Sequence, residues 1–122
     1  MYDEEKLLKL VDEPPIVRVL NLIISQAIND NAFAIRIEPS ETVISVKYKV
    51  EGILHEVMTP PAHISEVLAA RVKIMAGLDF RDTMNPQNGI INIKYDETAY
   101  LLEVESIPGP FGEILELQIK TG

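Results

Sequence analysis

The residue types that could carry out chemistry are few in this chain, and they are widely spaced. Glu103 and Glu105 lie two residues apart in an alternating segment, which would place both carboxylates on one face of a sheet. Such a pair could bind a cation or act as general acid and base, but a solvated strand face is the simpler interpretation. Ser106 lies outside any G-x-S-x-G pattern and is interpreted as a strand-end residue.

Metal and nucleotide sites are equally hard to assemble from this sequence. The chain has two histidines, His55 and His63, and no cysteine, so a three-histidine site and a thiolate site are both excluded. The phosphate-loop pattern G-x-x-x-x-G-K-[ST] is absent, and the six glycines are scattered as turn and cap residues. The sequence therefore predicts no catalytic residue, no cofactor site and no metal site.

Basic side chains form one modest cluster. Arg71 and Lys73 fall on a predicted helix, Arg81 follows that helix, and Lys47 and Lys49 share one face of a predicted strand. Residues of this kind could dock an acidic partner or a single phosphate group, or they could simply keep the chain in solution.

Composition narrows the function classes further. The 122 residues carry 11 Lys and Arg against 19 Asp and Glu, a net charge of −8, which disfavours binding to nucleic acid. No apolar run approaches the ~20 residues that a membrane-spanning helix needs. The acidic start, residues 1–5, differs from a secretory signal. We therefore expect a cytoplasmic protein without direct membrane insertion.

Two main helices are expected to position these residues. Residues 1–13 are interpreted as an N-terminal extension or short helix whose apolar side needs a cover, and residues 14–122 as a single domain. Apolar residues recur at helical spacing from Val17 to Ile28 after a proline pair, and again from Ile64 to Met75. Gly77 is suited to the C-cap of the second helix.

The remaining segments alternate with a period of two, which is typical of strands. The expected strands include Phe33–Ile37, Ile44–Val50, Ile53–Met58, Ile91–Tyr95, Tyr100–Val104 and Leu115–Ile119, while Asp79–Asn88 is interpreted as a loop. These elements predict an α+β fold, in which an antiparallel sheet of about six strands carries two main helices on one face.

Several stretches together resemble a known family. They include Pro15-Ile16-Val17-Arg18, Gly52-Ile53-Leu54-His55-Glu56-Val57, the run from Arg71 to Asp79, Pro86-Gln87 and Gly112-Glu113. In this order they resemble the domain before the ATPase core of bacterial type II secretion and type IV pilus motors, from about Pro15 to Ile119. The resemblance implies a PAS-like domain that packs on a neighbouring subunit's core in a hexamer, and whose arginines help to hold nucleotide.

The chain departs from that family where phosphate contacts are expected. The family usually has arginine at three positions where this chain has Ile90, Glu103 and Gln118. It usually has Ser-Asp-Ile-His where this chain has Phe33-Ala34-Ile35-Arg36, and an arginine before Asp-Gly where this chain has Lys49-Val50-Glu51-Gly52. A basic pair in the family is replaced by Thr83-Met84. Arginine recognises phosphate through a fixed fork of donors, and Glu103 would repel phosphate. The hypothesis is that the scaffold is kept and nucleotide handling is lost, with Lys49 as a residual phosphate-contact candidate.

The leading interpretation is a non-catalytic interaction module whose partner is a protein of secretion or pilus machinery or its motor ATPase. Its candidate contact surface is Arg71, Lys73, Phe80 and Arg81. A homo-oligomer is possible. One alternative is a fragment of a full-length secretion ATPase whose motor lies beyond residue 122, and another is a PAS-like domain that senses a small ligand.

Overall fold

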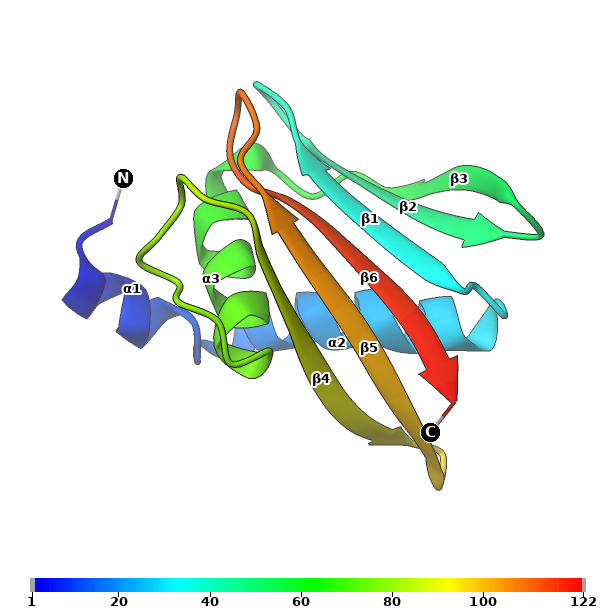
Figure 1. Ribbon diagram of the computed structural model, residues 1–122. Helices are drawn as coiled ribbons and strands as arrows, with labels where there is room; N and C mark the ends of the chain where they lie inside the picture. The colour runs from blue at the N-terminus through cyan, green and yellow to red at the C-terminus, as the bar shows by residue number, and fades with distance from the viewer. Residues whose placement is uncertain (1, 122) are drawn as a thin grey trace.

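The fold of the chain is α+β, as the sequence predicts, with one six-stranded antiparallel sheet and helices on one face of it. The computed structural model describes residues 2–121. In Figure 1 the sheet faces the reader, and the two long helices lie behind it. The elements in chain order are α1 (Glu4–Leu10), α2 (Pro14–Asn29), β1 (Ala34–Pro39), β2 (Ile44–Val50), β3 (Ile53–Met58), the 3-10 turn η1 (Ala62–Ile64), α3 (Ser65–Met75), β4 (Gln87–Tyr95), β5 (Thr98–Ile107) and β6 (Ile114–Thr121).

The sheet is built from two three-stranded meanders, and its strand order is β3-β2-β1-β6-β5-β4. The first meander is β1 to β3, and the second is β4 to β6. The last strand joins them, because β6 pairs with β1 in an antiparallel register that sets Ile35 opposite Leu117. Strands β3 and β4 are thus the two free edges of an open sheet.

The hydrophobic core fills the space between the sheet and the two long helices. Alternate side chains of the central strands, such as Ile35 and Leu117, are fully buried there against Leu20 of α2 and Val72 of α3. Tyr48 of β2 also points into this layer, and its hydroxyl donates a 2.6 Å hydrogen bond to the Ile23 carbonyl oxygen of α2. This bond satisfies the only polar atom of a buried ring.

The short helix α1 gains its cover from the main domain. Leu7 and Val11 are buried against Ile16, Val67 and Ala70, so that α1 closes one end of the α2–α3 layer. The Asp3 carboxylate caps α1 by accepting the backbone N–H of Lys6.

Strand β4 corrects one expectation from the sequence. The sequence predicts a loop at residues 87 and 88, but in the structure they pair with Ser106 and Glu105 of β5. Gly89 explains how the chain fits here, because a Cβ atom at this position would lie 2.5 Å from the Ala76 carbonyl oxygen. The end of α3 therefore approaches β4 closely, and Gly77 ends α3 with a positive φ of 73° as expected.

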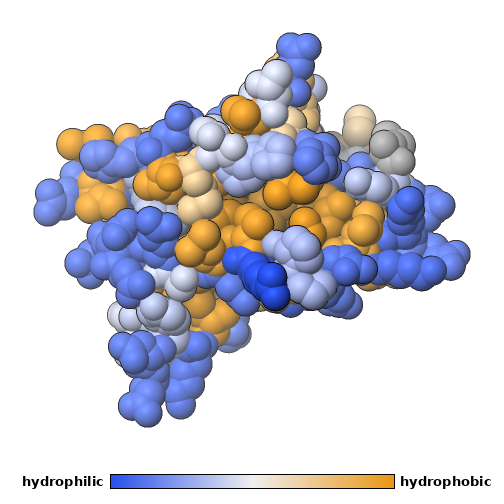
Figure 2. Space-filling view, turned by 180° about the vertical axis from the view of Figure 1, so that it is seen from behind, coloured by the Kyte–Doolittle hydropathy of each residue, from blue (hydrophilic) through white to orange (hydrophobic). Residues whose placement is uncertain are grey.

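The helix-covered face is not wholly polar. Figure 2 shows this face from behind, with apolar side chains gathered across its middle and hydrophilic ones around them. The described helices also leave Leu22 of α2 and Ile74 of α3 exposed. Within residues 2–121, no helix is long and apolar enough to cross a membrane.

Candidate functional site

Lys73, one of the four residues of the candidate contact surface, does not lie on the surface. Its side chain is fully buried, and its Nζ lies 2.7 Å from Glu113 Oε2 and donates to the Asp82 carbonyl oxygen at 2.6 Å. The hydroxyl of Ser106 donates to the same Glu113 oxygen at 2.7 Å. This network ties α3, the loop before β4 and the loop before β6 together, which makes Lys73 a structural residue.

Arg71 is also mostly engaged within the molecule. Its Nη1 donates to the Asp12 carboxylate at 2.6 Å and lies 3.5 Å from the Val11 carbonyl oxygen, so that it fixes the connection between α1 and α2 onto α3. Its Nε is buried and has no partner among the described residues. The Nη1 contacts thus hold the guanidinium against the α1–α2 connection, and 23% of the Arg71 side chain is exposed.

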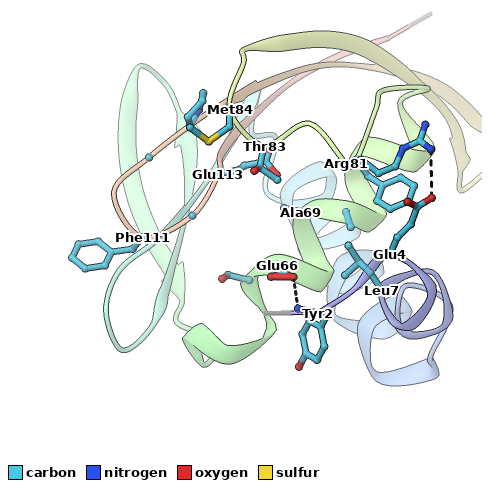
Figure 3. Close-up of a pocket in the computed structure, with 16 residues that line it drawn as sticks. Tyr2, Glu4, Leu7, Glu66, Ala69, Arg81, Thr83, Met84, Phe111 and Glu113 are labelled. Carbon is cyan, nitrogen blue, oxygen red and sulfur yellow. Dashed lines mark hydrogen bonds and ion pairs between the residues drawn. The ribbon is translucent and has the colours of Figure 1, made fainter.

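The two remaining candidates, Phe80 and Arg81, line a groove of about 670 Å³ beside the N-terminal half of α3. Figure 3 shows Ala69 and Glu66 on its floor, Leu7 and Arg81 on one side, and Met84 and Phe111 on the other. The full lining is Tyr2, Glu4, Leu7, Ser65, Glu66, Ala69, Ala70, Phe80, Arg81, Thr83, Met84, Pro108, Gly109, Phe111, Gly112 and Glu113. Segments far apart in sequence thus build one hollow.

The groove is acidic where the sequence suggested a basic patch. Arg81 donates to Asp79 at 3.1 Å and to Glu4 at 3.4 Å, so its charge is compensated locally. Hydrogen bonds from the backbone N–H and the side chain of Arg81 lower the pKa of the Asp79 carboxyl, and the same ion pair raises the pKa of Arg81. The lining of the groove itself contains three carboxylates, those of Glu4, Glu66 and Glu113.

The loop that carries Phe80 to Met84 is held in one shape by polar contacts. The Asp82 carboxylate accepts the side-chain amide of Asn85 at 3.0 Å and the backbone N–H of Met84 at 3.0 Å, and these bonds lower the pKa of Asp82. The side chain of Gln87 donates to the backbone carbonyl oxygens of Asp79 and Asp82. The exposed side chain of Met84 is therefore presented on an ordered loop.

Sequence reasoning missed Met84 and Phe111 as groove residues. Met84 is 79% exposed and Phe111 is 53% exposed. The available signal was a bulky apolar residue inside a turn-rich polar segment, which is unusual because such segments have little core to fill.

A second hollow, of about 490 Å³, lies on the sheet face away from the helices. The strand register places Ile90, Glu103 and Gln118 side by side on neighbouring strands. The next row of the same face holds Asn88, Glu105 and Glu116. Lys120 pairs with Glu103 at 2.6 Å, and Arg36 pairs with Glu116 at 2.8 Å, so both basic neighbours are already engaged.

Lys49 lies on this same outer face, two strands away. It is opposite Ala34 of β1, which is opposite Gln118 of β6. Its ammonium lies 5.6 Å from the centre of the Phe33 ring, a cation–π arrangement that holds it at the surface. Lys49 therefore shares a cross-strand row with the second hollow but is not part of its lining.

The other chemistry-bearing residues do not combine into a site. The carboxylates of Glu103 and Glu105 share a sheet face, as their spacing predicts, and His55 is exposed on the edge strand β3. Among residues 2–121, no three His, Cys, Asp or Glu side chains come together in a way that could hold a metal ion.

Comparisons with known proteins cover nearly the whole chain. The model of the family described as type II/IV secretion system protein matches residues 9–121. The chain is 39% identical over 83 residues to the type II secretion system ATPase E of Vibrio cholerae, a match that covers 68% of this chain and 16% of the relative. It is 36% identical over 83 residues to the type IV pilus assembly ATPase PilB of Myxococcus xanthus, covering 68% and 15%. The chain thus spans about a sixth of the length of the curated relatives that it matches.

Proposed function

The chain belongs to the type II/IV secretion system protein family, and we propose that it acts there as a non-catalytic interaction domain that no longer handles nucleotide. Its relatives at 39% and 36% identity are named as a secretion ATPase and a pilus assembly ATPase. The matched region is a small part of each relative, so the catalytic activity of those proteins is not carried over to this chain.

The observation that carries this proposal is the row of Ile90, Glu103 and Gln118 on the outer face of the sheet. At these three positions the family that the sequence resembles usually has arginine. Three arginines in such a row would be near neighbours, because adjacent strands lie about 4.8 Å apart. The present side chains offer a phosphate no cation, and Glu103 opposes it.

Calorimetric titration with Mg-ATP tests the loss of nucleotide handling. We expect no measurable binding by the chain at ATP concentrations up to about 1 mM, a weak-binding limit of about −4 kcal/mol. The informative variant restores Ile90→Arg, Glu103→Arg and Gln118→Arg together, and its control adds one arginine elsewhere on the same face, Glu56→Arg. Measurable Mg-ATP binding by the unaltered chain would contradict the loss of nucleotide handling, and failure of the triple variant to bind would contradict the assignment of that loss to these three positions.

The interaction surface that we propose is the groove beside Phe80 and Arg81. It keeps two of the residues named from the sequence, and it excludes Lys73 because that side chain is buried. A photo-crosslinking amino acid at position 84, introduced in cells that carry the secretion or pilus machinery, tests this surface. We expect crosslinks to a machinery component or motor ATPase, and none from position 22 on the exposed face of α2. Crosslinks that contain no machinery component would count against the proposed role.

A second candidate function rests on the small share of the relatives that the chain covers, 15% to 16%. Under it, the chain is the pre-motor part of a longer secretion ATPase. The complete reading frame distinguishes the two, because a phosphate loop downstream of residue 122 would make the whole protein an ATPase. The Mg-ATP titration separates them at the protein level, since a domain that still serves a motor would retain nucleotide contacts.

A further inference from the structure

We infer that the groove beside α3 binds a segment of a partner protein in which a bulky apolar side chain is flanked by lysine or arginine. This inference rests on the proposed function as an interaction domain, and it states which kind of partner residue each part of the groove would contact. Ala69 and Ala70 line the groove with small side chains, which occupy little of its volume.

The walls of the groove supply an apolar contact on both sides. Phe80 packs with Leu7 in one apolar cluster, and Figure 3 shows Leu7 on one side of the groove and Met84 and Phe111 on the other, with the Phe111 ring directed outward from its loop. Met84 and Phe111 leave 79% and 53% of their surface to solvent. A leucine or phenylalanine side chain that lies against Met84 and Phe80 would cover apolar surface of both residues, which favours association because that surface leaves water.

The loops that carry the walls are ordered before any partner arrives. Lys73 connects the backbone of Asp82 to Glu113, and Ser106 holds Glu113 from the other side. These bonds fix the loop with Met84 relative to the loop with Phe111. A pre-formed groove loses little conformational entropy on binding, so a short partner segment is enough to fill it.

The negative charge in the groove favours a partner segment that carries a positive charge. Glu66 Oε1 accepts the backbone N–H of Tyr2 at 3.0 Å, and no lysine or arginine of residues 2–121 forms an ion pair with this carboxylate. Glu4 and Glu113 are already paired, with Arg81 and Lys73. Glu66 is thus the lining carboxylate that remains available for a cation, and Figure 3 shows it in the middle of the groove.

Other occupants fit this chemistry less well. A phosphorylated or nucleic-acid partner would bring negative charge to an acidic groove on a chain of net charge −8. A second copy of the chain would bring the same excess of carboxylates and is disfavoured for the same reason. A segment with lysine or arginine beside an apolar residue satisfies both the walls and Glu66.

Fluorescence anisotropy with designed peptides tests this inference. The probe is a fluorescein-labelled twelve-residue peptide with two central leucines between lysines. Two matched peptides carry glutamine or glutamate in place of the lysines. We expect the lysine peptide to bind more tightly than the glutamine peptide, and the glutamate peptide to bind least. We also expect the preference to shrink when the salt concentration rises from about 0.05 M to about 0.5 M, because screening weakens exposed ion pairs.

Three variants locate the binding. Glu66→Gln should weaken the lysine peptide about threefold to fivefold, the range of an exposed ion pair, and leave the glutamine peptide unchanged. Met84→Gln should weaken both of these peptides about threefold to tenfold, because it replaces apolar surface of the wall by an amide without changing the charge. The control is Leu22→Gln, an exposed site on α2, which should change neither affinity.

Each contrary outcome overturns the inference in a recognisable way. Absence of binding by all three peptides at about 1 mM removes the groove as a peptide site. Equal binding of the lysine and glutamate peptides would contradict the charge selection. Loss of binding in Leu22→Gln but not in Met84→Gln would place the binding site elsewhere on the molecule. Peptide binding with crosslinks that contain no machinery component would keep the groove and refute the proposed function, so the two failures are distinguishable.

Discussion

At the scale of single residues, the buried ammonium of Lys73 connects the two loops beside the groove, through the Asp82 carbonyl oxygen and the Glu113 carboxylate. Lys73→Met removes the cation and leaves Glu113, itself 9% exposed, as an uncompensated charge. We expect this variant to lose about 3 kcal/mol of unfolding free energy, because breaking a buried pair from one side strands the other charge. Chemical denaturation measures the loss. The control is Lys9→Met on α1, whose ammonium is largely exposed and which should lose under about 0.5 kcal/mol.

The same pair allows a stricter test of this cause. If the stranded carboxylate is what destabilises Lys73→Met, then adding Glu113→Gln to it should recover part of the loss. Additive losses in the double variant would show that Lys73 acts through packing of its methylene stem and not through its charge.

Tyr48 makes the stability of the fold sensitive to strongly alkaline pH. Burial first, and then the charge of Asp30, raise the pKa of the Tyr48 hydroxyl from 10.0 to about 12. Because the pKa of Tyr48 is higher in the folded state than in the unfolded state, its contribution to the free energy of unfolding is complete at pH values below the unfolded-state pKa of 10.0. That contribution is lost as the pH rises from about 10 to about 12. Denaturation series across this range should show the loss, together with an ultraviolet titration of tyrosine.

The matched variant for this prediction is Tyr48→Phe, which keeps the ring and removes the hydrogen bond to Ile23. We expect it to lose about 1 kcal/mol at neutral pH and to show a shallower decline between pH 10 and 12. An unchanged alkaline decline in Tyr48→Phe would assign that decline to other groups.

At the scale of elements, α1 is held to the domain by a small apolar contact of its own. Leu7 is buried against the α2–α3 layer at 7% exposure, whereas the next residue, Leu8, is 44% exposed. Leu7→Ala should therefore cost about 2 to 3 kcal/mol, while Leu8→Ala should cost under about 0.5 kcal/mol, since both changes have the same helix propensity. Equal effects would show that α1 is not docked as described. Hydrogen exchange of the α1 amides should rise in Leu7→Ala alone.

The sequence predicts a helix or strand best where one side of that element is buried and the other side is exposed to solvent. The period of two in Ile44–Val50 and the helical period in α2 come from such one-sided burial, and both elements are found as predicted. The first residues of β4 were missed because they follow Pro86 and lie beside a glycine, features that usually indicate a turn. The pairing of β6 with β1 could not be predicted from the sequence either, because the paired residues lie about 80 positions apart in the chain and produce no local sequence pattern.

The sequence groups Phe80, Arg81 and Lys73 on one candidate contact surface. In the structure Phe80 and Arg81 line the groove, whereas Lys73 is buried, although a lysine on a helix normally indicates an exposed position. The burial of Lys73 depends on Glu113, which lies 40 residues later in the chain. Charge that is compensated by a distant residue cannot be recognised from local sequence. The acidic character of the groove emerges only when α1, α3 and the two loops are brought together.

For the whole molecule, the open sheet leaves two free edges, and β3 is the more exposed of them. Ile53 and Leu54 of β3 are 60% and 48% exposed, and the strand carries a single bulge opposite Val46 and Lys47. Unpaired apolar edges tend to pair with other chains. The net charge of −8 opposes this at neutral pH, because every copy repels the next.

This balance predicts how association depends on pH. Near the sequence pI of about 4.7 the repulsion disappears, and we expect light scattering by the chain to rise there and to fall again at pH 7. Leu54→Gln should slow that rise, because it makes the β3 edge polar without changing the net charge. Leu22→Gln, which changes an equally exposed leucine on α2, should not slow it. If both variants slow the rise alike, association at the isoelectric point uses apolar surface in general, and the free edge of β3 has no special part in it.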